Sequence, residues 1–136
     1  MDPEGTGLPR PVGPYSHSMR AGDLVFCAGS MPLDRSTSRP LAELDVRDQT
    51  RAVLDNLNAV LEAAGSSLGE VVRTTVYLAD LDDYAGMNEV YREYFGDPVP
   101  ARATVEVSRL IGGIAVEIDA IATVRSDTED KKEELR

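Results

Sequence analysis

The chain has 136 residues and a mass of 14.7 kDa, which fits one domain with its own core. Its net charge of −10 argues against a general affinity for phosphate backbones, so we expect no nucleic-acid partner. The single cysteine, Cys27, and the single histidine, His17, exclude a disulfide or a Cys/His zinc site within one chain, and no G-x-G-x-x-G, Walker A or G-x-S-x-G motif occurs.

The N-terminal third predicts a hairpin and an irregular excursion. Residues 1–12 are rich in Pro and Gly and should form a loosely held segment. Strands are predicted at 16–20 and 24–28, joined by a short turn. Residues 31–43, with two prolines and a polar run, predict an irregular connection. Cys27 lies in the second strand and is expected to be a small buried hydrophobe.

A strand between two helices is predicted next. The first helix has Asp45 as its N-cap, an apolar stripe on one side, and Gly65 as its stop. Residues 70–79 are rich in β-branched side chains and predict an interior strand. A second helix is predicted at 82–95, with inward-facing apolar and tyrosine side chains.

Two runs with the period of a β-strand follow, at 102–108 and 116–123. Each alternates apolar with polar residues, so each strand should have a core face and a polar face, which carries Arg102 in one and Glu117 in the other. If the strands are antiparallel around a connection at 110–114, these residues are offset by about six positions, on the order of 20 Å. One chain should not bring them together, so a shared site would lie between subunits of a closed oligomer. The alternative is two unrelated, solvated residues.

The order of elements predicts an α+β domain. The strand from residue 70, the second helix and the strand from residue 102 form a right-handed βαβ unit, and the last strand returns antiparallel. The result is a mixed sheet with two helices on one face, which leaves the other face needing a partner. Residues 125–136 form a charged tail, expected to be solvated or a frayed helix.

Three local features give further candidates for a site. Tyr15 lies where a turn meets a strand, and is either a packing aromatic or a site hydroxyl. Gly29, followed by Ser30, ends the second strand, where a glycine suggests close approach of the backbone to another group. Asn88, a poor helix former inside a predicted helix, is either an exposed residue or a carboxamide that orients a substrate.

The available chemistry is limited. The only lysines, Lys131 and Lys132, lie in the charged tail, so a Schiff base has no candidate. No apolar leader or run of 18 apolar residues occurs, so we expect no membrane partner and a cytoplasmic location. An enzyme of this sequence would work without a metal or another bound cofactor.

The chain resembles the RidA family, also called the YjgF family, from residue 13 to about residue 124. The similarity rests on several short motifs and two helix residues: GPYS at 13–16, GDLVF at 22–26 leading to Gly29, EAAG at 62–65, TTVYL at 74–78, Asn88 with Tyr91, PAR at 100–102 and EIDAIA at 117–122.

The resemblance implies a chorismate-mutase-like α+β fold for residues 13–124, a homotrimer, and sites in the clefts between subunits. It implies cofactor-free hydrolysis of reactive 2-imino acids, such as 2-aminoacrylate, to 2-keto acids and ammonia. Arg102 would bind the substrate carboxylate, Glu117 would hold or polarise the attacking water, and Tyr15 would position water or imine. The pocket would be lined by Gly29, Ser30, Asn88 and Thr104.

Departures from the family pattern leave the substrate open. Many relatives have Cys at the position of Thr104 and Gln at that of Ser30, and 110–113 lacks the Pro and charge of the usual loop. Two alternatives therefore stay open, a non-catalytic module that binds small carboxylates or 2-keto acids, and a pathway-specific hydrolase of a larger substrate. Ribonuclease activity, reported for some relatives, is the least expected because of the acidic charge.

Overall fold

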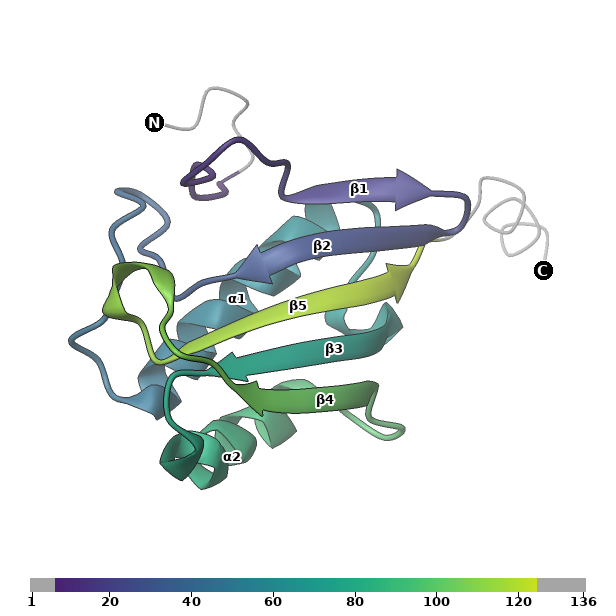
Figure 1. Ribbon diagram of the computed structural model, residues 1–136. Coiled ribbons are helices and arrows are strands. Elements are labelled where there is room, and N and C mark those ends of the chain that lie inside the picture. Colours follow the sequence, from purple (N-terminus) through teal and green to yellow (C-terminus); the bar gives the residue numbers. More distant parts are fainter. Residues whose placement is uncertain (1–6, 125–136) are drawn as a thin grey trace.

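The computed structural model describes residues 7–124, so residues 1–6 and the whole expected charged tail, residues 125–136, lie outside that range (Figure 1). Five strands form one mixed sheet, in the order β1-β2-β5-β3-β4, and both helices cover the same face of it (Figure 1). The predicted α+β class is confirmed. The elements are β1 (Ser18–Ala21), β2 (Leu24–Ser30), α1 (Val46–Ala63), η1 (Leu68–Glu70), β3 (Val71–Leu78), η2 (Leu81–Asp83), α2 (Tyr84–Tyr94), β4 (Ala101–Glu106), η3 (Ile111–Gly113) and β5 (Val116–Thr123).

Strand directions follow the predicted unit. β3 and β4 are parallel, and β5 is antiparallel to both β2 and β3. β5 therefore occupies the centre of the sheet and β4 an edge (Figure 1). This order keeps β4 and β5 from pairing, although only a short connection separates them in the chain.

Helix α1 begins and ends as predicted. The Asp45 carboxylate accepts a hydrogen bond from the backbone N–H of Asp48 at 2.9 Å and so caps the first turn. Gly65 follows the last turn with φ of +82°, a left-handed conformation that glycine adopts without a steric cost. The apolar stripe of the helix is fully buried against the sheet, through Val53, Leu54, Leu57 and Leu61.

Two buried amides fasten the excursion before α1 to the helix. Gln49 donates to the carbonyl of Leu44 at 2.8 Å and accepts from the backbone N–H of Ala115 at 2.7 Å, just before β5. Asn56 donates in the same way to the carbonyls of two excursion residues, Met31 and Leu33. The excursion is irregular, as predicted, but these bonds hold its backbone.

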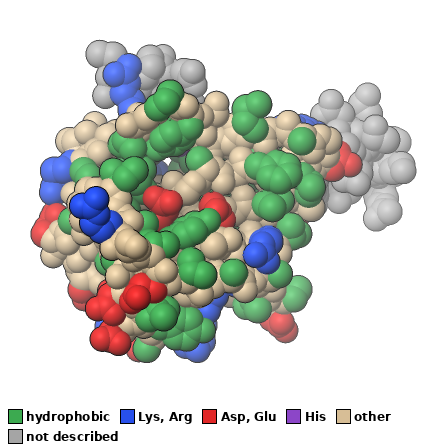
Figure 2. All heavy atoms as spheres, viewed as in Figure 1, with side chains coloured by type: hydrophobic (Ala, Val, Ile, Leu, Met, Phe, Trp, Pro, Cys, Tyr) green, Lys and Arg blue, Asp and Glu red, His purple; other side chains and the backbone are tan. Residues whose placement is uncertain are grey.

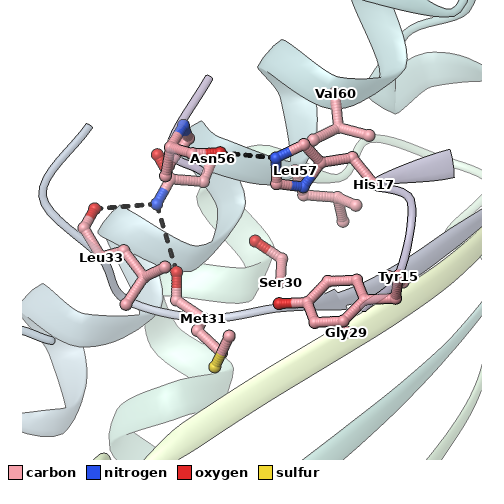
Figure 3. Close-up of a pocket in the computed structure, with 11 residues that line it drawn as sticks. Tyr15, His17, Gly29, Ser30, Met31, Leu33, Asn56, Leu57 and Val60 are labelled. Atoms are coloured by element: carbon pink, nitrogen blue, oxygen red, sulfur yellow. Dashed lines mark hydrogen bonds between the residues drawn. The ribbon is translucent and has the colours of Figure 1, made fainter. Parts of the chain in front are cut away.

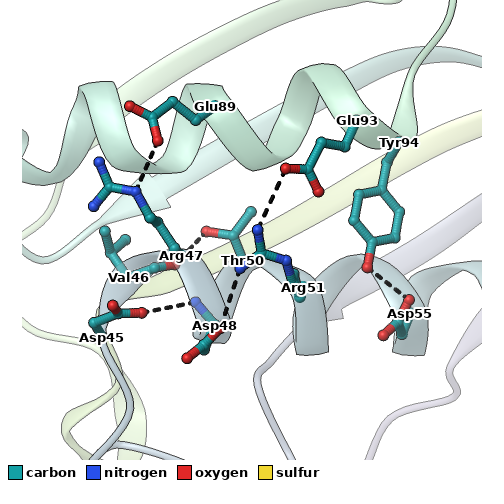
Figure 4. A network of polar contacts seen from close by, with 10 residues as sticks. All are labelled: Asp45, Val46, Arg47, Asp48, Thr50, Arg51, Asp55, Glu89, Glu93 and Tyr94. Carbon is teal, nitrogen blue, oxygen red and sulfur yellow. Dashed lines mark hydrogen bonds and ion pairs between the residues drawn. The ribbon is translucent and has the colours of Figure 1, made fainter.

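The outer surfaces of the two helices are joined by charged and polar pairs (Figure 4). These pairs are Arg47 with Glu89 at 2.8 Å, Arg51 with Glu93 at 3.3 Å, and the Tyr94 hydroxyl with Asp55 at 2.9 Å. Because the ion pairs are exposed to solvent, each contributes little to the stability of the fold. They connect the solvent-facing sides of α1 and α2.

Side chains along β5 alternate between the core and the face of the sheet that the helices do not cover, which we call the open face. The even-numbered residues pack beneath the helices, namely Val116, Ile118, Ala120 and Ala122. Cys27 of β2 lies beside Ala120 in this core, as expected of a buried hydrophobe. Burial, followed by the charge of nearby Asp119, raises the pKa of the Cys27 thiol to about 11.

The open face of the sheet carries large apolar side chains. Met19, Phe26 and Val105 are 65%, 43% and 42% exposed. Phe26 alternates with the core residues Val25 and Cys27 in β2, Met19 of β1 is paired with Phe26, and Val105 of β4 is paired with Tyr77. Figure 2 views this face and shows hydrophobic side chains gathered around acidic ones. Within residues 7–124 no helix or loop covers these side chains, so the open face has the exposed apolar character that is typical of an interaction surface.

Candidate functional site

Arg102 and Glu117 lie on opposite faces of the sheet. Arg102 is level with Thr74 of β3, which is fully buried beneath the helices. Glu117 is level with Tyr77 of β3, and both side chains occupy the open face. The expectation that the apolar residues of β4 face the core was wrong, because β4 is an edge strand: its Val105 faces the open side, and its polar residues face α2.

The backbones of Arg102 and Glu117 lie closer together than the sequence predicted. β3 lies between their strands, and Arg102 is level with Ala120, three positions from Glu117. Three residues along the strand and two strand spacings across give about 14 Å between the backbones, instead of about 20 Å. With the side chains on opposite faces, the two groups do not meet within one chain.

Arg102 belongs to a group that we call the arginine cluster, consisting of Arg102, Asn88, Tyr84 and Tyr91. Nη1 of Arg102 donates to Oδ1 of Asn88 at 2.8 Å, and Nη2 donates to the Tyr84 hydroxyl at 3.1 Å. The guanidinium carbon lies 4.7 Å from the ring centre of Tyr91 and 5.6 Å from that of Tyr84. Stacking and fork-like hydrogen bonds therefore fix the plane of the guanidinium.

α2 supplies every partner of Arg102 in this cluster. The three residues are spaced four and three positions apart, so they share one side of the helix. Asn88 was predicted as a pocket residue, whereas Tyr84 was not singled out, and Tyr91 was noted as inward-facing and as part of the family pattern but was given no role in the site. Their i, i+4, i+7 spacing on a helix that precedes the arginine strand was the signal available in the sequence.

Thr104 lies two positions after Arg102 on the same face of β4. Its hydroxyl oxygen is buried, and within residues 7–124 it has no hydrogen-bond partner. A buried hydroxyl without a partner is uncommon and costs free energy. The residue predicted to line the pocket thus presents an unused polar atom near the arginine cluster.

Glu117 lies against the backbone of Gly29. β2 contains an extra residue relative to β5 between Cys27 and Ser30, and this bulge brings Gly29 over the carboxylate. A Cβ atom at Gly29 would lie 2.5 Å from Oε2 of Glu117, so the predicted close approach is confirmed. Burial, followed by the charge of Asp119, raises the pKa of Glu117.

Asp119 holds a second carboxylate on the same face. It accepts from the Tyr77 hydroxyl at 2.9 Å and from the backbone N–H of Thr75 at 3.1 Å. These bonds fix its position two residues from Glu117. We call Glu117, Gly29, Asp119 and Tyr77 the glutamate cluster. Asp119 was not singled out, although the sequence Glu-Ile-Asp places both carboxylates on one face of a strand.

Tyr15 and Ser30 line a small cavity at the end of β2 that also involves Gly29 (Figure 3). Its volume of about 30 Å³ is enough for a water molecule. The Ser30 hydroxyl donates to the carbonyl of Val53 in α1 at 2.8 Å, and the Tyr15 hydroxyl accepts from the backbone N–H of Val12 at 3.3 Å.

The N-terminal segment forms one wall of this cavity. Its Pro9 is buried, and the carbonyl of Pro9 is hydrogen-bonded to Nε2 of His17. Arg10 donates its backbone N–H to the Ser38 hydroxyl at 2.9 Å. Residues 9–12, although expected to be loosely held, therefore contact the domain at several points.

The predicted site residues thus form two groups. Tyr15, Gly29 and Ser30 gather at the end of β2 together with Glu117, whereas Asn88 and Thr104 gather near Arg102 at the edge formed by β4 and α2. Between residues 7 and 124, no group of three His, Cys, Asp or Glu side chains is placed to hold a metal ion. None of the helices in this range is long and apolar enough to cross a membrane.

This fold, with an arginine at one edge and a carboxylate beneath a glycine bulge, defines a small α+β protein of the YjgF type. The chain belongs to the RidA (YjgF) family. The matching family model, described as Endoribonuclease L-PSP, spans residues 6–124. The resemblance inferred from the sequence motifs is confirmed by this match.

Similar proteins include RutC family proteins, one named deaminase and several solved structures. A RutC family protein of Pyrococcus horikoshii is 54% identical over 114 residues, which cover 84% of this chain and 90% of the relative. The chloroplastic Reactive Intermediate Deaminase A of Arabidopsis thaliana is 42% identical, over 85% of this chain and 62% of the relative. The crystal structure of E. coli TdcF with bound serine has a TM-score of 0.81 at 39% identity, covering 90% of this chain and 97% of TdcF.

Proposed function

We propose that this chain is a cofactor-free hydrolase that deaminates small 2-imino and 2-enamino acids, such as 2-aminoacrylate, to 2-keto acids and ammonia. The observation that carries the proposal is the arginine cluster. Two of the five N–H donors of the Arg102 guanidinium contact Asn88 and Tyr84 within residues 7–124, which leaves three for a substrate carboxylate. A relative named as a deaminase and a structural neighbour that holds serine support this choice.

The reaction needs few groups because the carbon of a C=N bond is already electrophilic. Water adds its oxygen to this carbon while the π electrons move to nitrogen, which takes a proton. The C–N bond of the resulting carbinolamine then breaks, nitrogen leaves as ammonia, and the C=O bond forms as the hydroxyl proton is released. An enamine enters the same route after its terminal carbon accepts a proton.

In this proposal Glu117 takes the proton of the attacking water and returns it to the leaving nitrogen, while Tyr15 positions water or imine. The direction of the Glu117 pKa, raised by burial and by Asp119, brings the carboxylate nearer to the pH at which a general base works best. Gly29, Ser30, Asn88 and Thr104 would line the pocket. Orientation of the substrate by Arg102 would supply the rest of the rate enhancement, since a well-aligned substrate and water avoid much of the entropic barrier.

Two chains would build each site. The arginine cluster and the glutamate cluster occupy different surfaces of one chain, so their meeting requires one surface of a chain to face a different surface of the next. Such heterologous contacts form a ring when the rotation closes, and three copies are proposed here. The apolar open face, with Met19, Phe26 and Val105, provides area for the ring to bury.

Small-molecule chemistry fits this chain better than cleavage of RNA, although the family model carries the description of an endoribonuclease. The net charge of −10 opposes the approach of a polyanion, whereas one arginine in a local cluster suffices for a single carboxylate. The proposal therefore places the protein in the cytoplasmic removal of reactive metabolites, without a nucleic-acid or membrane partner.

A coupled assay tests the activity. An amino-acid oxidase or a Ser/Thr dehydratase generates imines, and ammonia release is compared for wild type, Arg102→Ala and the control Arg51→Ala, which removes an arginine from the outer helix surface. Wild type and the control should accelerate release, and Arg102→Ala should not, with its oligomer intact. No acceleration by wild type on short or branched imines would contradict the deaminase, and 2-keto acid binding without turnover would then identify a non-catalytic module.

Mixed rings test the location of the site. Arg102→Ala and Glu117→Ala chains are co-expressed with different tags, and rings carrying both tags are isolated. Each mixed ring of three has one boundary at which an intact Arg102 meets an intact Glu117, so activity should return to about one third of wild type. Mixed rings no more active than either parent would contradict a site shared between chains.

A further inference from the structure

The arginine cluster contains a phenol to which neither the sequence motifs nor the proposed reaction gives a role. Tyr84 is the first residue of α2 and is 44% exposed. Its hydroxyl oxygen accepts from Nη2 of Arg102 at 3.1 Å, while Asn88, one turn later, accepts from Nη1 at 2.8 Å. The first turns of α2 therefore hold both terminal nitrogens of the guanidinium.

We propose that Tyr84 is a positioning residue whose neutral hydroxyl orients the Arg102 guanidinium for a substrate carboxylate, and whose phenolate competes with that carboxylate for the same guanidinium. This inference rests on the proposed function in one respect, that Arg102 binds the carboxylate. A neutral phenol uses one N–H donor and adds no charge. A phenolate at the same place is an anion already paired with the guanidinium, so a carboxylate must displace it or bind beside it.

A phenylalanine at this position would keep the aromatic face near the guanidinium but would lose both proposed roles. The hydroxyl is thus the informative atom, and removing it alone separates hydrogen bonding from stacking. The exposure of Tyr84 also matters, because its phenolate would keep part of its contact with water. Tyr91 lacks this property, since its hydroxyl is buried against that of Thr74.

Hydrogen bonding and charge around Tyr84 together favour its ionised form. The Asn88 side chain first, and then the charge of Arg102, lower the pKa of the Tyr84 phenol, and Arg92 acts in the same direction. Charged groups on the elements next to Tyr84 are Arg102 and Glu106 of β4, Glu89, Arg92 and Glu93 of α2, and Asp80, Asp82 and Asp83 in and before η2.

Calorimetry with 2-oxobutanoate as the probe tests the competition, from about pH 7 to about pH 10.5. Wild-type affinity should fall above the Tyr84 pKa, by at most about tenfold per pH unit, because the phenolate competes with the carboxylate for the guanidinium. Tyr84→Phe should bind about three- to tenfold more weakly at neutral pH, the usual net effect of one hydrogen bond, and should show no alkaline loss. Far-UV circular dichroism at each pH checks that the fold persists.

Tyr94→Phe is the matched control. Its hydroxyl lies on the same helix but bonds Asp55 of α1, and burial raises its pKa to about 12, so this variant should follow wild type. A probe-free measurement adds an independent readout. The ¹³Cζ resonance of Tyr84, identified by its loss in Tyr84→Phe, should titrate below the ordinary pKa of tyrosine and move up in Arg102→Met.

The outcomes separate this inference from the function on which it rests. Wild type that binds no 2-keto acid at neutral pH would overturn the carboxylate site and the competition together. Binding by wild type with an equal alkaline loss in Tyr84→Phe would overturn the role of Tyr84 alone. An ordinary titration of Tyr84, unchanged by Arg102→Met, would do the same.

Discussion

Gly29→Ala is expected to remove activity by displacing Glu117 while leaving the fold almost unchanged. The added Cβ would lie 2.5 Å from Oε2 of Glu117, and ordinary contact begins at 3.4 Å, so the carboxylate must move by about 0.9 Å. A displacement of about 1 Å in a reacting group costs on the order of a hundredfold in rate. Because the obstacle is the end of a flexible side chain, stability should change by less than about 1 kcal/mol.

A double-mutant cycle measures this effect. The rate of ammonia release is compared for Gly29→Ala, Glu117→Ala and the double variant, with Gly96→Ala as the control because its added Cβ would meet open space. Once Glu117 is gone, Gly29→Ala should have little further effect. The reasoning would be refuted by wild-type rates in Gly29→Ala, or by an equal loss in both backgrounds.

Two further predictions concern stability. Because burial and Asp119 raise the Glu117 pKa in the fold, ionisation of Glu117 destabilises the protein above that pKa, and the cost disappears as the pH falls below the ordinary carboxyl value. Glu117→Gln should therefore raise Tm at about pH 7 and much less at about pH 4, and a shift of equal size at both values would contradict the assignment. Gln49→Leu should lower the free energy of unfolding by about 2 to 4 kcal/mol, because it removes the buried hydrogen-bond partners of the Leu44 carbonyl and the Ala115 N–H. Urea unfolding at fixed protein concentration measures this loss. A loss below about 1 kcal/mol would show that these groups find other partners.

Features with a local cause were predictable from the sequence. Asp45 caps α1 because a carboxylate accepts from the helix N-terminus, and Gly65 ends it because glycine tolerates the left-handed conformation. Gly29 similarly indicated close approach of the backbone to another group. Each of these interpretations needed only a few neighbouring residues.

Features that depend on strand order were not predictable in the same way. The alternation around Arg102 gave the period of β4 correctly, but the face of each residue depends on which strand is the neighbour and where the edge lies. Insertion of β5 between β2 and β3 pairs residues about 100 and 45 positions apart, which local periodicity does not encode. Tyr84 was missed for the same reason, since it meets Arg102 only after α2 has packed beside β4.

The buried Cys27 thiol of β2 provides a natural probe of local unfolding in this part of the chain. With a pKa of about 11, Cys27 has a thiolate fraction on the order of one in ten thousand at neutral pH, so thiol reagents have almost nothing to attack in the closed state. It is also the sole cysteine in the sequence. The rate of its alkylation therefore measures how often β2 separates from the core, without any engineered label.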